Sequence, residues 1–229
     1  MHLAPMPDAL PAGIEIFRLD LDLQADAQQA LQHLTPEERS RARRYVRRAD
    51  RVRFAQTRNA VRCLLGQRLG CCPSEVPLSM GPHGKPFVDE APQCAPVFNV
   101  SHSGDHALIA LADPCGVMHL GVDIEQQRSD LDADVMLDVV CTAQERDSVR
   151  SAPDVLSAFY QRWVGKEAVL KAIGIGVAEH LCSIDISPQA DGRLAIASEV
   201  PEWNGFQAMA LPAPPGYAAA LAWRTKEST

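Results

Sequence analysis

Four charged side chains occur at spacings that can bring them together in one site. In residues 121–125, Gly-Val-Asp-Ile-Glu, apolar and acidic residues alternate, which predicts a short strand with Asp123 and Glu125 on one face. Two carboxylates held side by side repel each other unless a cation or a proton lies between them. A predicted helix farther along the chain presents Glu167 and, one turn later, Lys171. Three acids and a lysine suit a hard divalent cation and an anionic, oxygen-rich substrate, which usually means phosphate.

Each of these motifs also has a purely structural interpretation. An Asp-x-Glu strand end is often a solvated edge, and Glu167 with Lys171 is a favoured helical ion pair. The motifs that surround them favour the functional interpretation because of their order. Gly84-Lys85-Pro86 comes first and is followed by residues 99–104, Asn-Val-Ser-His-Ser-Gly. The acidic strand comes next, and the helix with the pattern Trp-x-x-Lys-Glu-Ala-x-x-Lys is last.

This ordered set resembles a 4′-phosphopantetheinyl transferase of the larger, surfactin-synthetase-activating (Sfp) type. The resemblance covers residues 84–171 and, through an arginine-rich helix, extends back to about residue 35. It implies an α+β fold that is a pseudo-dimer of two similar α/β halves, with the active site in the cleft between them. The halves would be residues 1–113 and 114–229, which divide in the turn before the acidic strand.

The resemblance also implies an activity. The enzyme would be Mg²⁺-dependent and would move the 4′-phosphopantetheine of coenzyme A to a serine hydroxyl of an apo acyl or peptidyl carrier protein. Adenosine 3′,5′-bisphosphate would be released. Asp123, Glu125 and Glu167 would hold the metal, and Asp123 and Lys171 would also contact the coenzyme. Lys171 would neutralise the coenzyme diphosphate as charge shifts during transfer.

The group that accepts the serine proton is left open. Glu145 resembles the acid that follows a Phe/Cys-x-x-x-Glu turn in the family, which makes it a candidate general base. Glu167 and a water molecule are the alternatives for the catalytic role. A solvated glutamate at the start of a helix is the structural alternative for Glu145.

The remaining site residues are those implied to bind coenzyme A. Within Asn-Val-Ser-His-Ser-Gly, the family pattern makes His102 a contact to the 3′-phosphate, with Ser101 donating alongside. Arg41 matches a basic contact to the same phosphate, and Arg44 is expected to support it. Lys85 would face the nucleotide.

The formal charge of −7 hides a strongly basic segment. Residues 39–68 hold eleven arginines against one acid, Asp50, so the rest of the chain carries −17. Arg41, Arg44 and Arg48 would share one stripe of a continuous helix. Such a block could serve as a nucleic-acid-binding module, but a chain with only 5% aromatic residues is poorly suited to stacking on bases. The interpretation we favour is therefore no nucleic acid partner.

Composition limits the remaining alternatives. The 229 residues are 46% hydrophobic and 22% charged, as in soluble globular proteins, and no apolar run is long enough to span a membrane. The seven cysteines form no Cys-x-x-Cys pair, which favours reduced thiols in a cytoplasmic protein. We expect a monomer. A Mg²⁺-dependent phosphohydrolase would use the same acids, and the sequence does not choose among fatty-acid, polyketide and peptide-synthetase carriers.

Hydrophobic periodicity predicts the elements that position these residues. Two helices are expected from Thr35 to about Ala49 and over 52–69, then a long loop over 72–96 and a hairpin of 97–102 with 106–111. A strand at 117–125 follows, with further helices over 134–149 and 155–173. An amphipathic strand over 14–23 precedes all of these, and a terminal antiparallel set follows them at 181–186, 193–197, 206–210 and 217–223. The resemblance also implies that Val135–Val140 receives the carrier protein.

Overall fold

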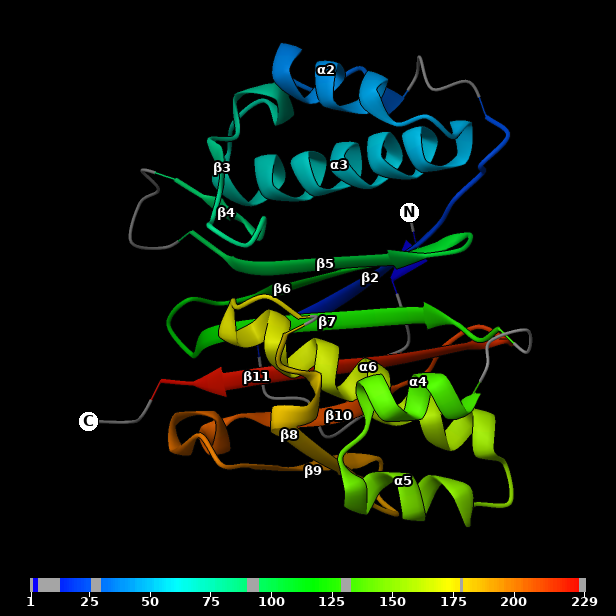
Figure 1. Ribbon diagram of the computed structural model, residues 1–229. Helices are drawn as coiled ribbons and strands as arrows, with labels where there is room; N and C mark the ends of the chain where they lie inside the picture. Colours follow the sequence, from blue (N-terminus) through cyan, green and yellow to red (C-terminus); the bar gives the residue numbers. More distant parts are fainter. Residues whose placement is uncertain are drawn as a thin grey trace.

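The computed structural model describes residues 2–3, 13–25, 30–89, 95–128, 133–177 and 179–226, with only the backbone described at 2–3 and 133–134. Figure 1 shows two stacked α/β halves, the first coloured blue to green and the second green to red. Among the described residues, none of the helices combines the length and apolar character that crossing a bilayer requires.

The first half is built around a four-stranded antiparallel sheet in the order β1-β2-β6-β5. Helix α3 runs along this sheet and buries Val61 and Leu65 against Phe98 and Ile109. The elements of this half are β1 (His2–Leu3), β2 (Ile14–Asp20), α2 (Pro36–Arg44), α3 (Arg48–Leu69), a 3₁₀ turn (Pro73–Glu75), β3 (Leu78–Met80), β4 (Pro86–Val88), β5 (Val97–Ser103) and β6 (His106–Ala112).

The second half is built around a five-stranded antiparallel sheet in the order β7-β11-β10-β9-β8. Helix α6 packs on its face through residues such as Ala168 and Leu170, which meet Ala220 and Ile184 in one core cluster. The elements of this half are β7 (Val117–Gln126), α4 (Ala133–Val140), α5 (Ala143–Arg150), α6 (Val155–Ile173), β8 (Ile184–Pro188), β9 (Arg193–Ser198), β10 (Gln207–Leu211) and β11 (Tyr217–Thr225), with 3₁₀ turns at Leu181–Ser183 and Pro201–Gly205.

The two halves repeat one topology. In each, the last strand lies between an earlier strand and the next-to-last strand: β2-β6-β5 matches β7-β11-β10. A long helix, α3 or α6, follows the first strand in both. A shared core joins the halves, since Ile16 of β2, Val122 of β7 and Met209 of β10 belong to one buried cluster. The expected α+β pseudo-dimer is confirmed.

The arginine-rich segment differs from its prediction. Thr35 and Glu38 form the expected capping box, but α2 ends at Arg44 and α3 begins at Arg48, so the break precedes the predicted one near Ala49. Tyr45 is extended, with φ −69° and ψ 123°. Arg41, Arg44 and Arg48 therefore do not lie on one continuous helical stripe, and that prediction was wrong.

The predicted helix over 134–149 is also two helices. Helix α4 ends at Val140, and α5 begins at Ala143 after an N-cap at Thr142. The hydroxyl of Thr142 accepts from the amide of Glu145, and a Glu145 carboxylate oxygen accepts from the amide of Thr142 at 2.8 Å. This capping box starts a new helix inside the predicted one, and it fixes Glu145 in a structural position.

Candidate active site

Two neighbouring strands supply the central side chains of the site. Asp123 and Glu125 of β7 face the next strand, β5, where Ser101 and Ser103 lie at the same two-residue spacing. The Ser101 hydroxyl donates to Asp123 Oδ1 at 2.7 Å, and the Ser103 hydroxyl donates to Glu125 Oε2 at 2.8 Å. The matched spacing fixes both carboxylates against a partner from the other half of the molecule.

Helix α6 brings the third acid and the lysine over the same strand. At Gly121 of β7, an added Cβ would collide with the carbonyl oxygen of Ala168, so only glycine lets the helix approach this closely. Glu167 and Lys171 lie one turn apart on α6, with Lys171 Nζ 3.4 Å from Glu167 Oε2. The close approach of α6 to β7 therefore places both side chains at Asp123.

Asp123, Glu125 and Glu167 form an acidic cluster whose ligand oxygens all lie within 4.8 Å of one another. Burial, followed by the negative charge of Asp123, raises the pKa of Glu125 to about 7 and raises that of Glu167. Asp123 is fully buried, and its Oδ2 atom has no hydrogen-bond partner among the described residues. An orphaned buried carboxylate oxygen beside two further acids fits a hard divalent cation.

Lys171 is the cation that the structure itself supplies to this cluster. Its Nζ lies 2.5 Å from Asp123 Oδ1 and donates to the Ser101 hydroxyl at 3.0 Å. Burial opposes the protonated form, but the carboxylates of Asp123 and Glu167 raise the pKa of Lys171, so it stays positively charged.

Trp163 is a site residue that the sequence analysis missed. Its indole Nε1 donates to Glu167 Oε1 at 2.6 Å, and its ring stacks on Tyr160 with centroids 5.4 Å apart. Trp163 is the first residue of the Trp-x-x-Lys-Glu-Ala-x-x-Lys pattern, but the sequence analysis gave it no role in the site. Its i, i+4 spacing from Glu167 was the available signal, because such pairs meet on one helix face.

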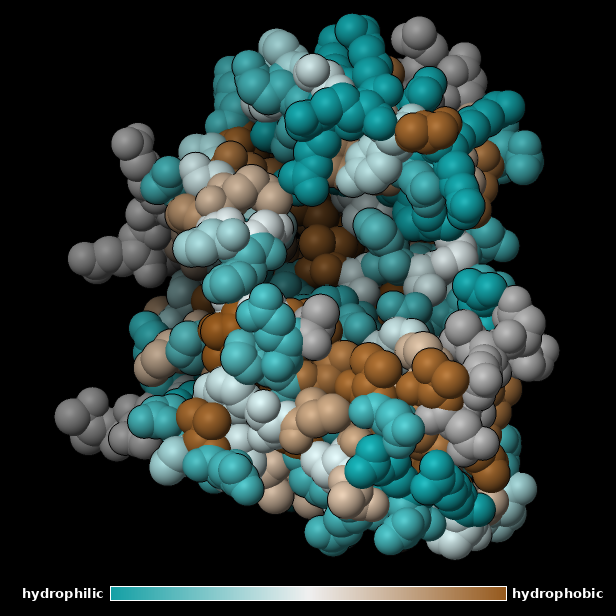
Figure 2. All heavy atoms as spheres, in the orientation of Figure 1, coloured by the Kyte–Doolittle hydropathy of each residue, from teal (hydrophilic) through white to brown (hydrophobic). Residues whose placement is uncertain are grey.

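A cleft of about 260 Å³ lies beside the acidic cluster, between the two halves. Figure 2 shows it as a hollow with an apolar floor near the middle of the molecule. Helices α2 and α3, the turn before β4, strand β5 and the C-terminal end of α6 all contribute to it. Its basic lining residues are Arg41, Arg58, His83, Lys85, His102 and Lys171. The cleft can therefore hold a polyanion with an apolar portion.

Arg41 and His102, both predicted to bind phosphate, line this cleft. The Arg41 guanidinium lies 5.3 Å from the centre of the Phe54 ring. Desolvation by the surrounding protein, followed by the charge of Arg53 and Lys171, lowers the pKa of His102. The ring is therefore neutral near pH 7 and offers one N–H donor.

Ser101 and Arg44, which were also predicted to bind the coenzyme, do not line the cleft with Arg41 and His102. Ser101 and His102 are consecutive in β5 and point to opposite faces, and the Ser101 hydroxyl is engaged by Asp123 and Lys171. Arg44 is exposed and does not line the cleft. The structure thus assigns Ser101 to the acidic cluster and leaves Arg44 on the outer surface of α2.

Glu145 lies away from both the cleft and the acidic cluster. It is 2% exposed, and its carboxylate forms an ion pair with the buried Lys166 at 2.5 Å. It also accepts from the amides of Thr142 and Ile186, at 2.8 and 2.7 Å. A carboxylate engaged in this way holds α5 to α6 and β8. The structure does not place it where it could accept a proton from a substrate.

Lys85 lines the cleft, but its ammonium is directed elsewhere. Nζ donates to the carbonyl oxygens of Leu120 and Lys171, at 3.0 and 2.6 Å, and of Ala172 at 3.4 Å. Burial lowers its pKa to about 8, so it remains mainly protonated at neutral pH. A lysine from the first half therefore ties together the strand and the helix that carry the acids.

Replacing Lys85 with methionine is expected to lower the stability of the fold and the rate of turnover, and to change ligand affinity less. Three carbonyl oxygens would lose their donor, which should lower the free energy of unfolding by about 1–3 kcal/mol. Thermal denaturation and steady-state kinetics would check this. A rise in KM for coenzyme A, the substrate that the resemblance implies, as large as that caused by Arg41→Ala, with unchanged stability, would show a direct ligand contact instead.

Sequence comparison relates both halves to known families. A family model described as "4′-phosphopantetheinyl transferase superfamily" matches residues 119–222, and one described as "4′-phosphopantetheinyl transferase, N-terminal" matches residues 23–114. A solved holo-(acyl-carrier-protein) synthase from Bacillus anthracis is 17% identical with a TM-score of 0.42, covering 49% of this chain and 99% of that one.

Curated relatives match over longer spans. The 4′-phosphopantetheinyl transferase HetI of Nostoc sp. is 30% identical over 196 residues, which cover 83% of this chain and 80% of HetI. A Synechocystis protein is 35% identical over 147 residues, and the chain spans only 58% of that relative's length. The 4′-phosphopantetheinyl transferase Sfp of Bacillus subtilis is 24% identical over 78% of this chain and 76% of Sfp.

Proposed function

The chain belongs to the 4′-phosphopantetheinyl transferase family, and we propose that it transfers the 4′-phosphopantetheine of coenzyme A to a serine hydroxyl of an apo carrier protein. The observation that supports this best is the basic cleft beside the acidic cluster, with Lys171 belonging to both. A polyanionic coenzyme and a charge-neutralising reaction centre would therefore be adjacent.

Coenzyme A would lie with its nucleotide in the cleft and its diphosphate at Lys171. Arg41 and His102 would contact the 3′-phosphate, since both line the cleft and neither has an acidic partner among the described residues. The apolar wall formed by Val61, Val100 and Ile175 offers a surface for the adenine ring.

Mg²⁺ is the cation that we propose for the acidic cluster, held by Asp123, Glu125 and Glu167. A bound cation there would offset the negative charge of the diphosphate and favour oxygen ligands, as Mg²⁺ sites in proteins do. Ser101, Ser103 and Trp163 each donate to one of these acids, which fixes the orientation of the carboxylates.

In the reaction, the serine oxygen of the carrier would bond to the phosphorus that bears the pantetheine. The bond from that phosphorus to the bridging oxygen would break, and adenosine 3′,5′-bisphosphate would leave with the electron pair. The Lys171 ammonium would stabilise the charge that develops on the leaving group. Because Glu145 lies outside the site, Glu167 and a water molecule are the remaining candidates for the proton acceptor.

The basic segment supports this function better than nucleic acid binding. Within the described part of the chain, at least seven of its eleven arginines bond to backbone carbonyl oxygens or carboxylates, and Glu38 pairs with both Arg62 at 2.6 Å and Arg58 at 3.5 Å. A segment whose cations are mostly engaged internally does not offer the free basic face that nucleic acid binding requires. The seven arginines are Arg39, Arg48, Arg51, Arg53, Arg58, Arg62 and Arg68.

Helix α4 is our candidate for carrier docking. Val135 and Val139 are 59% and 56% exposed, whereas Leu137 and Val140 are buried beneath them. Figure 2 shows an apolar patch over α4, below the cleft. Exposed aliphatic side chains on one helix face suit an apolar partner surface.

Replacing Val139 with glutamate is expected to raise KM for the carrier protein about tenfold and leave KM for coenzyme A unchanged, because a charge would enter the contact. Met136 is a poorer test, since it packs against the core. Met118→Glu, at the opposite end of β7 from Glu125, is the matched control. Equal KM values for the carrier in both variants would remove α4 from the interface.

The transferase activity is tested directly by one assay. Purified protein, coenzyme A, Mg²⁺ and a panel of apo carrier proteins would be incubated, and a mass increase of one phosphopantetheine on the carrier would be read by mass spectrometry. Release of inorganic phosphate without a carrier would instead indicate a phosphohydrolase. The same panel would identify whether fatty-acid, polyketide or peptide-synthetase carriers are preferred.

Three further features belong to this proposal. We place the boundary between the halves at 113/114. Strand β6 ends at Ala112, and the match to the N-terminal family model ends at residue 114, which supports this position. A cytoplasmic monomer is our working assignment. The described cysteines are all free thiols, as a reducing compartment would leave them.

A further inference from the structure

The segment that ends α4 and the turn that precedes β8 meet at one buried lysine. Lys166 of α6 donates to the carbonyl oxygens of Val140 and Leu181, at 2.7 and 2.9 Å. The residue that follows each of these acceptors is a cysteine, Cys141 or Cys182. One ammonium thus holds the two cysteines on neighbouring segments, although they are 41 positions apart in the sequence.

The thiol of Cys182 lies against the end of α4. Its Sγ donates to the Val139 carbonyl oxygen at 3.3 Å and lies 3.8 Å from the carbonyl oxygen of Cys141. A thiol is a weak donor, so little is lost when these contacts break. The Cys182 sulfur therefore already lies at the backbone of Cys141, and rotation of the Cys141 side chain toward it is the movement that a disulfide needs.

The two thiols differ in exposure. Cys182 is exposed and borders a surface pocket of about 650 Å³, together with Thr142 and Asp185. Cys141 is 1% exposed and packs in the core of the second half. Burial, followed by the negative charge of Glu145, raises the pKa of the Cys141 thiol to about 11, so this thiol stays protonated at neutral pH. An oxidant in solution therefore reaches Cys182 first.

We propose that Cys141 and Cys182 form a reversible disulfide when the protein reacts with a peroxide, and that this bond regulates the use of the carrier protein. The Cys182 sulfur attacks one peroxide oxygen, the O–O bond breaks, and a sulfenic acid and water form. The Cys141 sulfur then attacks the Cys182 sulfur, and its proton leaves with the departing hydroxide as a second water. The two thiols together lose two hydrogen atoms, and the peroxide is reduced to two water molecules.

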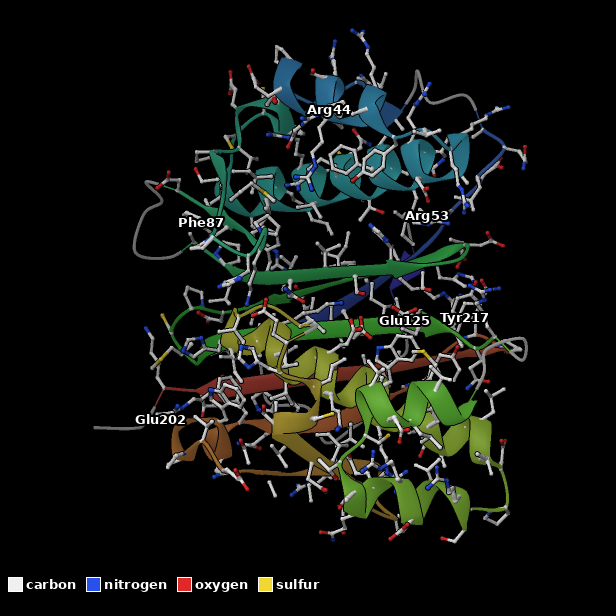
Figure 3. The ribbon with its side chains drawn as sticks, viewed as in Figure 1. Arg44, Arg53, Phe87, Glu125, Glu202 and Tyr217 are labelled. Atoms are coloured by element: carbon white, nitrogen blue, oxygen red, sulfur yellow. The ribbon has the colours of Figure 1, made fainter. Side chains whose placement is uncertain are left out.

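The disulfide acts on α4 and not on the cleft. Neither cysteine lines the cleft or belongs to the acidic cluster, and Figure 3 labels Glu125 of that cluster on β7 and shows α4 on the same half of the molecule. Formation of the bond releases the contact from Cys182 to Val139 and draws Cys141 out of the core, which changes the last turn of α4. That turn carries the exposed side chain of Val139, proposed above to receive the carrier, so this effect rests on the proposed function.

Non-reducing peptide mapping tests the bond itself. After treatment of the purified protein with a small excess of hydrogen peroxide, we expect two peptides joined through Cys141 and Cys182, about 2 Da lighter than the separate thiols. Cys182→Ser should abolish this pair. Cys115→Ser, which removes an exposed cysteine from the turn before β7, is the matched control and should keep it. Links between other cysteines, or a sulfinic acid at Cys182 without a link, would overturn the pairing.

Transfer kinetics test the regulatory role. Peroxide treatment of the wild-type protein is expected to raise KM for an apo acyl carrier protein about three- to tenfold and to leave KM for coenzyme A unchanged. Dithiothreitol should restore the first value, and Cys182→Ser should resist the treatment. A linked peptide without a change in KM, or an equal change in Cys182→Ser, would overturn the regulation. Failure of the untreated protein to modify any carrier would refute the transferase function and with it the regulation, whereas the peptide map tests the disulfide independently.

Discussion

Asp123→Asn is expected to lower kcat/KM for transfer by about 100- to 1,000-fold while the protein stays folded. The substitution preserves the shape of the side chain but removes its charge. Asp123 is the fully buried member of the acidic cluster, it pairs with Lys171 at 2.5 Å, and its Oδ2 atom is the orphaned oxygen available to a cation. Steady-state transfer to a carrier protein, measured over a range of Mg²⁺ concentrations, would check the expectation.

The same variant should require more Mg²⁺ for half-maximal activity, because one of the three proposed ligands loses its charge. Asp191→Asn is the matched control, since it lies in the turn before β9, two strands beyond β11 in the sheet. Circular dichroism would establish that both variants fold. Wild-type turnover by folded Asp123→Asn would refute the metal-site assignment.

Local periodicity predicted the two parts of the acidic cluster, and the resemblance to a known family predicted that they meet. The alternation around Asp123 and the one-turn spacing of Glu167 and Lys171 are short-range rules, and the structure brings these side chains together. What sequence could not supply is the approach of α6 to β7 at Gly121 or the bond from Lys85 to the Leu120 carbonyl oxygen. The first depends on tertiary packing within the second half, and the second depends on how the two halves pack against each other.

The errors of the sequence analysis came from local rules that were not applied. Consecutive strand residues face opposite sides, so Ser101 and His102 were never able to point into the same space. The sequence Thr142-Ala-Gln-Glu145 is a capping box, which predicts a helix start and a structural glutamate. The prediction of one helix over 134–149 ran through this N-cap, although residues of both helices, such as Leu137 and Val149, do share one core cluster.

Arg41→Ala is expected to raise KM for coenzyme A by about 10- to 100-fold, the loss of one charge-assisted contact of about 1.5–3 kcal/mol. The expected effect on 3′-dephospho-coenzyme A is much smaller, because that substrate lacks the phosphate that Arg41 is proposed to bind. Arg41 lines the cleft with its guanidinium near the Phe54 ring, and His102 reaches the same cleft from β5. His102→Ala should also raise KM for coenzyme A more than KM for 3′-dephospho-coenzyme A. The rise should be smaller than in Arg41→Ala, since the ring of His102 is neutral near pH 7.

Arg44→Ala separates a specific contact from the general charge of the segment. Arg44 belongs to the same helix and carries the same charge, but it is exposed and does not line the cleft. Its KM values for both substrates should stay within about twofold of wild type, because exposed charges are screened by solvent and salt. Equal losses for coenzyme A and its dephospho form in Arg41→Ala would mean that Arg41 contacts another part of the coenzyme or the carrier. A large coenzyme-specific loss in Arg44→Ala would show that the basic segment acts as a whole and not through the residue that the fold places in the cleft.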